Sequence, residues 1–418
     1  MAVLILSVPG CTLDNDELTS PTEGGDAMVT FAIQLPGAKL AKTRALDETD
    51  ENAISDIDVL VFKPGGGEYV YSARCSGSDI TSSGDNQKTF TVKLRQGEFD
   101  LAIIANARSV LTATPLTGKT KSDALSELKT QIPSSGKWIT DKTGLGYRAI
   151  PMWGNIGDKT INKSTNLTGS NAISLTRMVA RVDVKIDEAV TNFKLTSVHV
   201  FNYNTHGAVV PGSTAWDASN KITTTPTVPS ATTLTEGPIN YDNDNGKTEI
   251  NTTTNSCEKE IYLFESENHT DAEHEKEKDL LDRTCVVVGG IYDTDSDPTY
   301  YRVDFSSGSG ASQTDFLDVL RNYLYIFNIT RVSGPGFNTP EDAFNSEPFN
   351  IEAKVLRWNQ ADMTNVAFDG QNLLSVSQDK FIFSSDERKD EGEDNVLSVF
   401  TDYTTTSSSA KSGWYVKK

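Results

Sequence analysis

The clearest pattern in the sequence is an alternation of apolar and polar residues near its start. Four apolar side chains occupy every second position: Val29, Phe31, Ile33 and Leu35. An extended backbone places every second side chain on one face, so residues 27–37 are predicted to form a strand with an apolar face. A polar connector over residues 38–50 follows and carries Arg44 before Ala45. The apolar face of this strand must pack in a hydrophobic core. We interpret the strand as a plug that can be removed, and the connector as a segment that a protease can cut.

The next part of the chain is predicted to add more strands and one helix. Residues 54–62 and 69–75 form two strand patterns joined by a glycine-rich turn. Residues 89–95 and 99–106 flank a three-residue loop with a central glycine, which predicts a hairpin. Apolar residues spaced three and four apart predict a helix over residues 122–132.

A second set of strands is predicted after a polar, turn-rich stretch. The strand patterns cover residues 173–186, 193–204, 261–264, 284–292, 300–305, 322–331 and 349–358. Residues 205–255 are rich in Thr, Pro, Asn and Gly, and are predicted to form long surface loops. The expected fold class is therefore all-β with few short helices.

The charge of the chain limits its partners. Its 418 residues include 38 basic and 58 acidic side chains, which gives a formal net charge of −20. Such a balance repels nucleic acid and anionic membrane surfaces. No nucleic-acid partner is expected, and membrane contact is expected only through a lipid anchor.

Cys11 ends a short apolar run at the start of the sequence. The run is too short to span a bilayer. Val8-Pro9-Gly10-Cys11 resembles the lipobox of bacterial lipoproteins, in which the cysteine becomes the lipidated first residue. The polar, acidic residues 12–26 are typical of the tether after a lipid anchor. The alternative interpretation is a frayed terminus with an incidental cysteine.

Cys257 and Cys285 flank an acidic insertion and leave two alternatives open. The two thiols either form a disulfide or stay free, because sequence spacing does not show whether their Cα atoms approach. The chain has no C-x-x-C motif, so a zinc or redox site is not supported.

A series of short motifs runs in order from the start of the chain to about residue 365. Besides Cys11, they are Leu35-Pro36-Gly37, Thr43-Arg44-Ala45, Ile57–Phe62, Gly97–Leu101, Ile150–Gly154, Leu175–Val184 and Arg321–Tyr325. In this order and spacing they resemble the fimbrillin subunits of Bacteroidales, the type V pilin family.

The resemblance implies two tandem β-sandwich-like fimbrillin domains. Residues 1–26 would be the lipoprotein signal and tether. Residues 27–172 would be the N-terminal domain, with the first strand at 27–37 and the cleavable linker at 38–50. Residues 173–368 would be the C-terminal domain.

The resemblance also implies a function in cell-surface fimbriae that serve cell adhesion. Subunits of this family are exported as lipoproteins to the cell outer membrane, here through Cys11. A trypsin-like protease then cuts the linker, here between Arg44 and Ala45, and the plug strand leaves. Strand exchange follows, because an exposed apolar groove with unpaired backbone groups accepts a strand from another subunit. The partners would be other fimbrial subunits, in a tip, accessory or stalk role, and the host or bacterial surface ligand stays unknown.

Residues 369–418 depart from the fimbrillin pattern. They resemble part of a BACON-type immunoglobulin-like module and cover about half of one. Three interpretations stay open: a three-stranded remnant, a truncated chain, or an extension that offers a strand to a neighbouring subunit. A subunit with this extension fits a tip, accessory or anchoring role better than a stalk role.

No catalytic, metal or cofactor site is predicted, and the chain is not expected to be an enzyme. Hydrolase, phosphate-binding and dinucleotide motifs are absent from the sequence. His199 fits a strand position that is packed or solvent-facing rather than catalytic, and the acidic loop around His269 and His274 fits a solvated charge run. The alternative function is a non-polymerising surface lipoprotein that binds carbohydrate, with Trp216 as an exposed stacking residue. Trp153 and Trp414 are expected to pack in cores.

Overall fold

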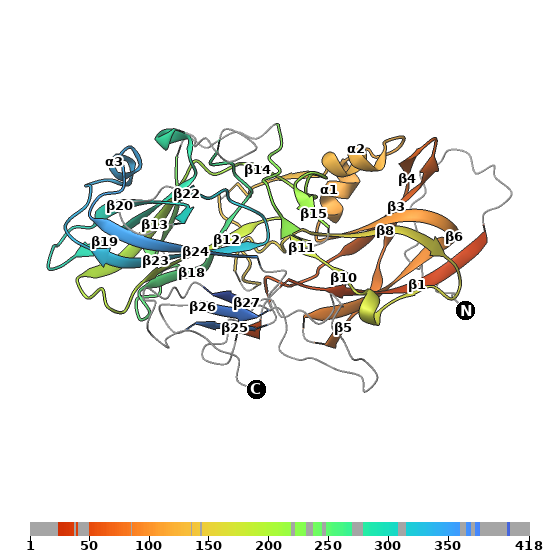
Figure 1. Ribbon diagram of the computed structural model, residues 1–418, viewed down its shortest axis with the longest axis horizontal. Helices are drawn as coiled ribbons and strands as arrows, with labels where there is room; N and C mark the ends of the chain where they lie inside the picture. The colour runs from red at the N-terminus through yellow and green to blue at the C-terminus, as the bar shows by residue number, and fades with distance from the viewer. Residues whose placement is uncertain are drawn as a thin grey trace, which may run out of the picture.

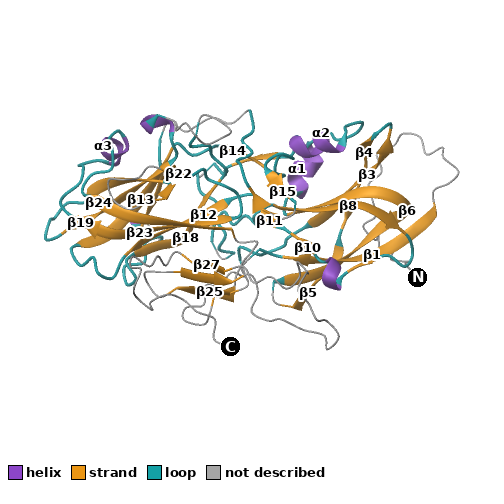
Figure 2. Cartoon of the chain, viewed as in Figure 1, coloured by secondary structure: helices purple, strands orange, loops and turns teal. Residues whose placement is uncertain are grey.

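The computed structural model describes most of the chain between residues 24 and 359, and short strands beyond it. The described residues are 24–36, 39–40, 50–84, 86–134, 136–142, 144–218, 222–230, 237–244, 248–269, 279–307, 315–359, 365–368, 373–376 and 399–401. Cys11, Arg44, Ala45, His274 and Trp414 lie outside these residues. Strands dominate the fold, and the described residues contain three short α-helices (Figure 2).

The first unit is a β-sandwich in which one long strand takes part in both layers (Figure 1). The first half of β6 (Gln87–Ala105) pairs with β1 (Gly24–Gln34) and β5 (Ser78–Gly84). Its second half pairs with β3 (Ile57–Gly65) and β8 (Met152–Ile161). The remaining strands are β4 (Glu68–Ser76), β9 (Asn166–Leu167), β10 (Ile173–Ser174) and β11 (Thr176–Arg177). Apolar side chains from both layers form one core.

The predicted hairpin around Gly97 is wrong, because β6 continues through it as one strand of 19 residues. Gly97 has a φ of +155°. A Cβ there would lie 3.1 Å from Cζ of Phe99. Glycine therefore lets the strand pass from one layer to the other where a side chain would crowd the Phe99 ring.

The predicted helix over residues 122–132 is correct only in its first part. The helix α2 (Lys121–Ser126) is capped by Thr120, whose hydroxyl accepts from the Asp123 amide at 3.2 Å. The chain then forms β7 (Lys129–Gln131), because these residues pair with β14 (His206–Ala208) from the second unit. A further helix, α1 (Arg108–Ala113), has no counterpart in the sequence prediction.

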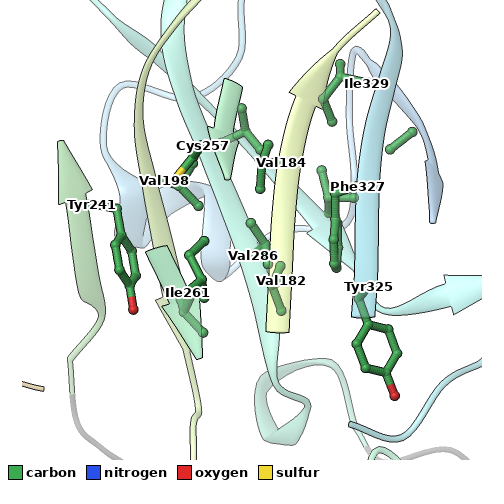
Figure 3. Close-up of a cluster of buried hydrophobic side chains, with 14 of the residues drawn as sticks. Val182, Val184, Val198, Tyr241, Cys257, Ile261, Val286, Tyr325, Phe327 and Ile329 are labelled. Atoms are coloured by element: carbon green, nitrogen blue, oxygen red, sulfur yellow. The ribbon is translucent and has the colours of Figure 1, made fainter. Parts of the chain in front are cut away.

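The second unit consists of two four-stranded sheets packed face to face. One has the order β18 (Ser256–Leu263), β12 (Ala180–Ile186), β23 (Tyr323–Val332) and β24 (Ile351–Asn359). The other has the order β17 (Ile239–Asp242), β13 (Phe193–Phe201), β19 (Cys285–Tyr292) and β20 (Thr299–Asp304). Figure 3 shows side chains of the core between them, including Val184, Val198 and Phe327.

The surface-loop prediction for residues 205–255 is wrong in part. This stretch contains β14, β17 and the hairpin of β15 (Trp216–Asp217) and β16 (Ile222–Thr223). Tyr241 and Ile250 are buried in the core of the second unit. Burial here depends on isolated apolar residues, which a window of mostly polar residues conceals.

Several smaller elements complete the fold. The helix α3 (Pro340–Phe344) packs against β19 and β20. Turns of 3₁₀ helix cover Gly169–Asn171 and Leu280–Asp282, and β21 (Ser306–Ser307) pairs with β22 (Asp315–Phe316). A four-stranded sheet joins β2 (Lys39–Leu40), β25 (Asn365–Phe368), β26 (Leu373–Val376) and β27 (Val399–Thr401).

The two units share a third apolar cluster. It contains Phe62 and Trp138 from the first unit, and Val209 and Phe264 from the second. Two pairs join strands from the two sides of this point, β7 with β14 and β2 with β25. The other strands through Arg177 pair within the first unit, and the other strands from Ala180 onward pair among themselves. We therefore propose that the two domains meet between Arg177 and Ala180, a few residues beyond the sequence expectation.

Candidate functional site: the slot of the first strand

The first strand lies inside its sheet and not at an edge. It pairs with β6 in antiparallel register along Gly24–Gln34. On its other side it pairs in parallel with β9 and β10, for example through Phe31 with Leu167 and Ile33 with Ile173. We call the space between β6 and the pair β9–β10 the β1 slot. The first described strand of the sequence thus fills an internal position of the sheet.

The apolar face of β1 supplies a large part of the first core. Val29, Phe31, Ile33 and Leu35 are buried, and the Phe31 ring stacks on Phe90 with centroids 5.1 Å apart. On the opposite face Met28 is 59% exposed. The predicted alternation therefore matches the burial of these side chains.

The C-terminal end of β1 is held by buried polar groups. The Pro36 carbonyl accepts from Nδ2 of Asn52 at 2.8 Å and from Nη2 of Arg177 at 3.2 Å. Just before it, the Leu35 amide donates to the Asn86 carbonyl at 2.7 Å. Asn52 and Arg177 are buried, so the end of β1 is fixed by donors that have little access to water.

These donors belong to a buried polar network that reaches the second unit. Nη2 of Arg177 donates to Oδ1 of Asn52 at 2.6 Å, and Nη1 of Arg181 donates to Oε1 of Glu51 at 2.9 Å. The Tyr262 hydroxyl donates to the same Glu51 oxygen at 2.8 Å. Burial raises the pKa of Glu51, but the positive charges of Arg181 and Arg177 outweigh it and leave this pKa below its usual value.

The N-terminal end of β1 is held by exposed groups. Nε2 of Gln96 donates to the Gly25 carbonyl at 2.7 Å. Lys93 forms an ion pair with Asp26 at 2.6 Å, and both side chains are about half exposed. Water competes for these contacts, so they bind the strand less firmly than those at Pro36.

An acidic cavity lies close to this network, between the two units. It has a volume of about 250 Å³, and Glu51, Lys137, Glu249 and Glu260 are among its lining residues. Lys137 and Glu249 form an ion pair at 2.5 Å. Burial, and then the negative charge of Glu249, raise the pKa of Glu260 to about 7.

Cys257 and Cys285 are free thiols, so the disulfide alternative is wrong. Cys257 points into the core between the two sheets of the second unit. Val286 belongs to that core as well, whereas Cys285 belongs to a separate cluster with Phe201 on the outer face of β19. Successive side chains of a strand point to opposite faces, so the two sulfurs lie on opposite sides of this sheet. Burial raises the pKa of Cys285 to about 12.

The histidines within the described residues have structural partners. His199 bonds to Oγ of Ser197 at 2.9 Å and to Oδ1 of Asn240 at 2.7 Å, and burial lowers its pKa. His269 is buried and pairs with Asp318 at 3.1 Å, so the solvated-loop interpretation is wrong for His269. Over the described ranges, no group of three His, Cys, Asp or Glu side chains is arranged to hold a metal ion.

The tryptophan expected to stack on sugars is not freely exposed. Trp216 is half-buried and packs edge-on against Trp153, with centroids 5.2 Å apart. Trp153 is itself buried, as expected. Trp216 therefore lacks the free exposure that the carbohydrate-binding alternative expects. Among the described residues, no helix is long and apolar enough to cross a membrane.

The fold and the β1 slot define the class of this protein: a tandem all-β protein whose first strand completes the interior of a sheet. The profile of the Fimbrillin-A associated anchor proteins Mfa1 and Mfa2 matches residues 25–364, and the chain belongs to this family. The resemblance to fimbrillins drawn from the sequence motifs is thereby confirmed.

The chain shares limited sequence identity with individual relatives. The chain is 29% identical over 174 residues to the minor fimbrium tip subunit Mfa3 of Porphyromonas gingivalis, a match that covers 39% of this chain and 37% of that protein. The chain thus spans little more than a third of this curated relative.

Two solved structures are also similar to the chain. A putative cell adhesion protein from Parabacteroides distasonis has the same fold, with a TM-score of 0.50, 15% identity and coverage of 82% of this chain and 100% of that one. The tip protein Mfa3 with a C-terminal truncation has a TM-score of 0.47 and 17% identity, and the match covers 80% of this chain and 99% of that one.

Proposed function

We propose that this chain is a structural subunit of cell-surface fimbriae that assembles by strand exchange and serves cell adhesion. Its relatives are fimbrial proteins, and the observation that carries the mechanism is the position of β1. An internal strand contributes four buried apolar side chains, yet it precedes a linker with a basic residue before Ala45.

Removal of β1 would open two backbone edges at once, because β6 and the pair β9–β10 would lose their partner. Burial of the four side chains contributes roughly 6–12 kcal/mol before ordering costs. A strand from another subunit can recover most of this free energy, since strand addition supplies both backbone hydrogen bonds and side-chain contacts. The first strand thus keeps the precursor from assembling too early.

The processing and location follow from the same scheme. Lipidation at Cys11 would hold the precursor at the cell outer membrane. A trypsin-like protease would cut between Arg44 and Ala45, and the mature subunit would enter the surface fimbrium. Other fimbrial subunits would be its partners, in a tip, accessory or stalk position.

Limited proteolysis tests this proposal. The purified chain is treated with an arginine-specific protease under native conditions, the new N-terminus is sequenced, and the product is run on SDS gels without boiling. We expect a new N-terminus at Ala45 and a ladder of SDS-resistant oligomers. The Arg44→Ala chain is the control and should give neither. A chain that is cut at Ala45, loses β1 and stays monomeric would contradict strand exchange.

A further inference from the structure

We propose that the β1 slot contains an aromatic pocket over Phe90, and that it selects an incoming strand with an aromatic side chain at the position of Phe31. The inference rests on the proposed strand exchange and states which partner strand the slot accepts. The partner that fits is a strand of another subunit with one aromatic side chain between aliphatic ones, two positions away on either side.

Phe31 lies in the part of the slot where β1 has a neighbouring strand on each side. Its register partners are Phe90 on β6 and Leu167 on β9. The rings of Phe31 and Phe90 are stacked, with an angle of 11° between their planes, and both are buried. A stacked aromatic pair stabilises by more than the apolar area it buries. An aliphatic side chain in place of Phe31 would lose this contact.

The floor of the pocket is closed by tight packing behind the Phe90 ring. Gly77 lies between β4 and β5, and a Cβ at this position would lie 2.7 Å from Cδ2 of Phe90 and 2.5 Å from Cγ2 of Ile57. The ring therefore lies directly against the Gly77 backbone and cannot move deeper. Phe90, Gly77 and Ile57 do not belong to the removable segment, so they stay in the chain for the incoming strand.

The neighbouring positions of the slot differ from this pocket in the size of the side chains that meet there. The inward pairs of β1 with β6 are Ala27–Leu94, Val29–Val92, Phe31–Phe90 and Ile33–Lys88. The backbone ladder repeats every two residues, but this series of side chains does not.

A strand shifted by two residues would therefore fit badly. It would place an aliphatic side chain over Phe90, which leaves a void, and it would place its own ring opposite Val92 or Lys88. Val29 and Ile33, which occupy these two positions, are fully buried, so a ring there would crowd the core. The position of one aromatic residue thus distinguishes a matching strand from a merely alternating one.

Peptide competition tests the pocket. The full-length chain is nicked in the linker, and synthetic peptides in reducing buffer compete with a fluorescent copy of residues 24–36 for the slot. One peptide exchanges two residues, Phe31→Ile with Ile33→Phe, and so moves the ring by two positions. The matched control exchanges Val29→Ile with Ile33→Val and leaves the ring in place. Both keep the composition and the alternation of the natural peptide, and every change is in a peptide, so the chain is identical in all measurements.

We expect the peptide with the moved ring to compete about thirtyfold more weakly than the natural one, and the control exchange about fivefold more weakly or less. A third peptide with Phe31→Leu keeps an apolar side chain and should compete about tenfold more weakly.

Equal competition by the natural peptide and the peptide with the moved ring would overturn the aromatic pocket and leave strand exchange standing. Equal weakening by the two exchanges would also overturn it, because any rearrangement of apolar residues would then have the same effect. Failure of the fluorescent natural peptide to enter the slot would overturn both proposals.

Discussion

At the residue scale, buried charges in this protein are paired with more than one partner. Arg321 donates to Glu265 from Nε at 2.8 Å and from Nη2 at 2.6 Å. It also donates to the carbonyls of Val209 and Ala208 at 3.0 and 2.9 Å. Arg321 thus connects the segment just before β23 to the C-terminal end of β14.

Arg321→Met should therefore be strongly destabilising. It leaves the buried Glu265 carboxylate without its cation, and we expect a loss of about 3–5 kcal/mol in the free energy of unfolding. Arg331→Met is the control, because the Arg331–Glu352 pair is exposed and should contribute within about 1 kcal/mol. Urea titration measures both, and equal small losses would contradict the role given to Arg321.

Glu260 makes the stability depend on pH. Its pKa is raised from 4.5 to about 7, so folding favours the protonated carboxyl. That contribution is complete below pH 4.5 and is lost as the pH rises through 7. Glu260→Gln should remove the loss, so that between pH 5 and pH 8 the natural chain loses about 1–2 kcal/mol more than the variant.

Glu258→Gln is the matched control for this measurement. Burial raises the pKa of Glu258, but its ion pair with Lys185 at 2.6 Å, together with other contacts, lowers it overall. Its contribution is therefore present above pH 4.5 and is lost at lower pH, the opposite sign to Glu260. If denaturation curves give the natural chain and Glu260→Gln the same slope with pH, the assignment to Glu260 is wrong.

Few of these residue roles could be predicted from the sequence. Arg177 and Arg321 occur in motifs that indicate the family, but their partners are distant along the chain. Pro36 lies 141 residues from Arg177, and Glu265 lies 56 residues from Arg321. Pairing of this kind depends on how the strands are arranged, and local patterns contain no information about it.

At the element scale, β1 presents one face to the core, while the other face is exposed at Met28 and covered at Ala32. Phe31→Asp would bury a carboxylate against Phe90. We expect the strand to leave its slot and the uncut chain to form oligomers. Met28→Asp is the control on the same strand, because Met28 is exposed and pairs across from Lys93. Size-exclusion chromatography with light scattering should give oligomers for the first variant and monomers for the second. A monomeric Phe31→Asp chain would argue against the plug.

Strands were easier to predict than the places where they bend. The alternation at Val29–Leu35 and the apolar run of β3 both indicate strands correctly, because burial on a sheet follows a period of two. The sequence around Gly97 predicts a hairpin loop, since glycine permits a turn and a bend alike. Only the pairing of β6 with β1 on one half and with β8 on the other distinguishes the two.

At the scale of the whole molecule, the shared apolar cluster links the two units. Phe264 of the second unit packs edge-on against Trp138 of the first, with centroids 6.0 Å apart. We expect both units to unfold in one cooperative transition, with coincident curves by tryptophan fluorescence and by far-UV circular dichroism. Two separated transitions would mean that the cluster does not couple the units.

Phe264→Ala should lower the stability of the joined units by about 3–5 kcal/mol. Phe349→Ala is a suitable control, because Phe349 is 57% exposed. The contact between the two units could not be predicted from the sequence. Trp138 and Phe264 lie in different units, and β7 and β14 pair in stretches for which the sequence pattern predicts helix and loop.

Hydrogen exchange on assembled subunits tests strand exchange most directly. The chain is cut at Arg44, the released N-terminal fragment is removed, and exchange is measured in the oligomers at the β6 amides of Gln87–Gln96 that pair with β1. Strand exchange predicts that these amides are as protected in the oligomer as in the uncut monomer, because another subunit's strand now fills the slot. Oligomers in which the same amides exchange freely would show that the subunits associate through another surface, and would contradict the account.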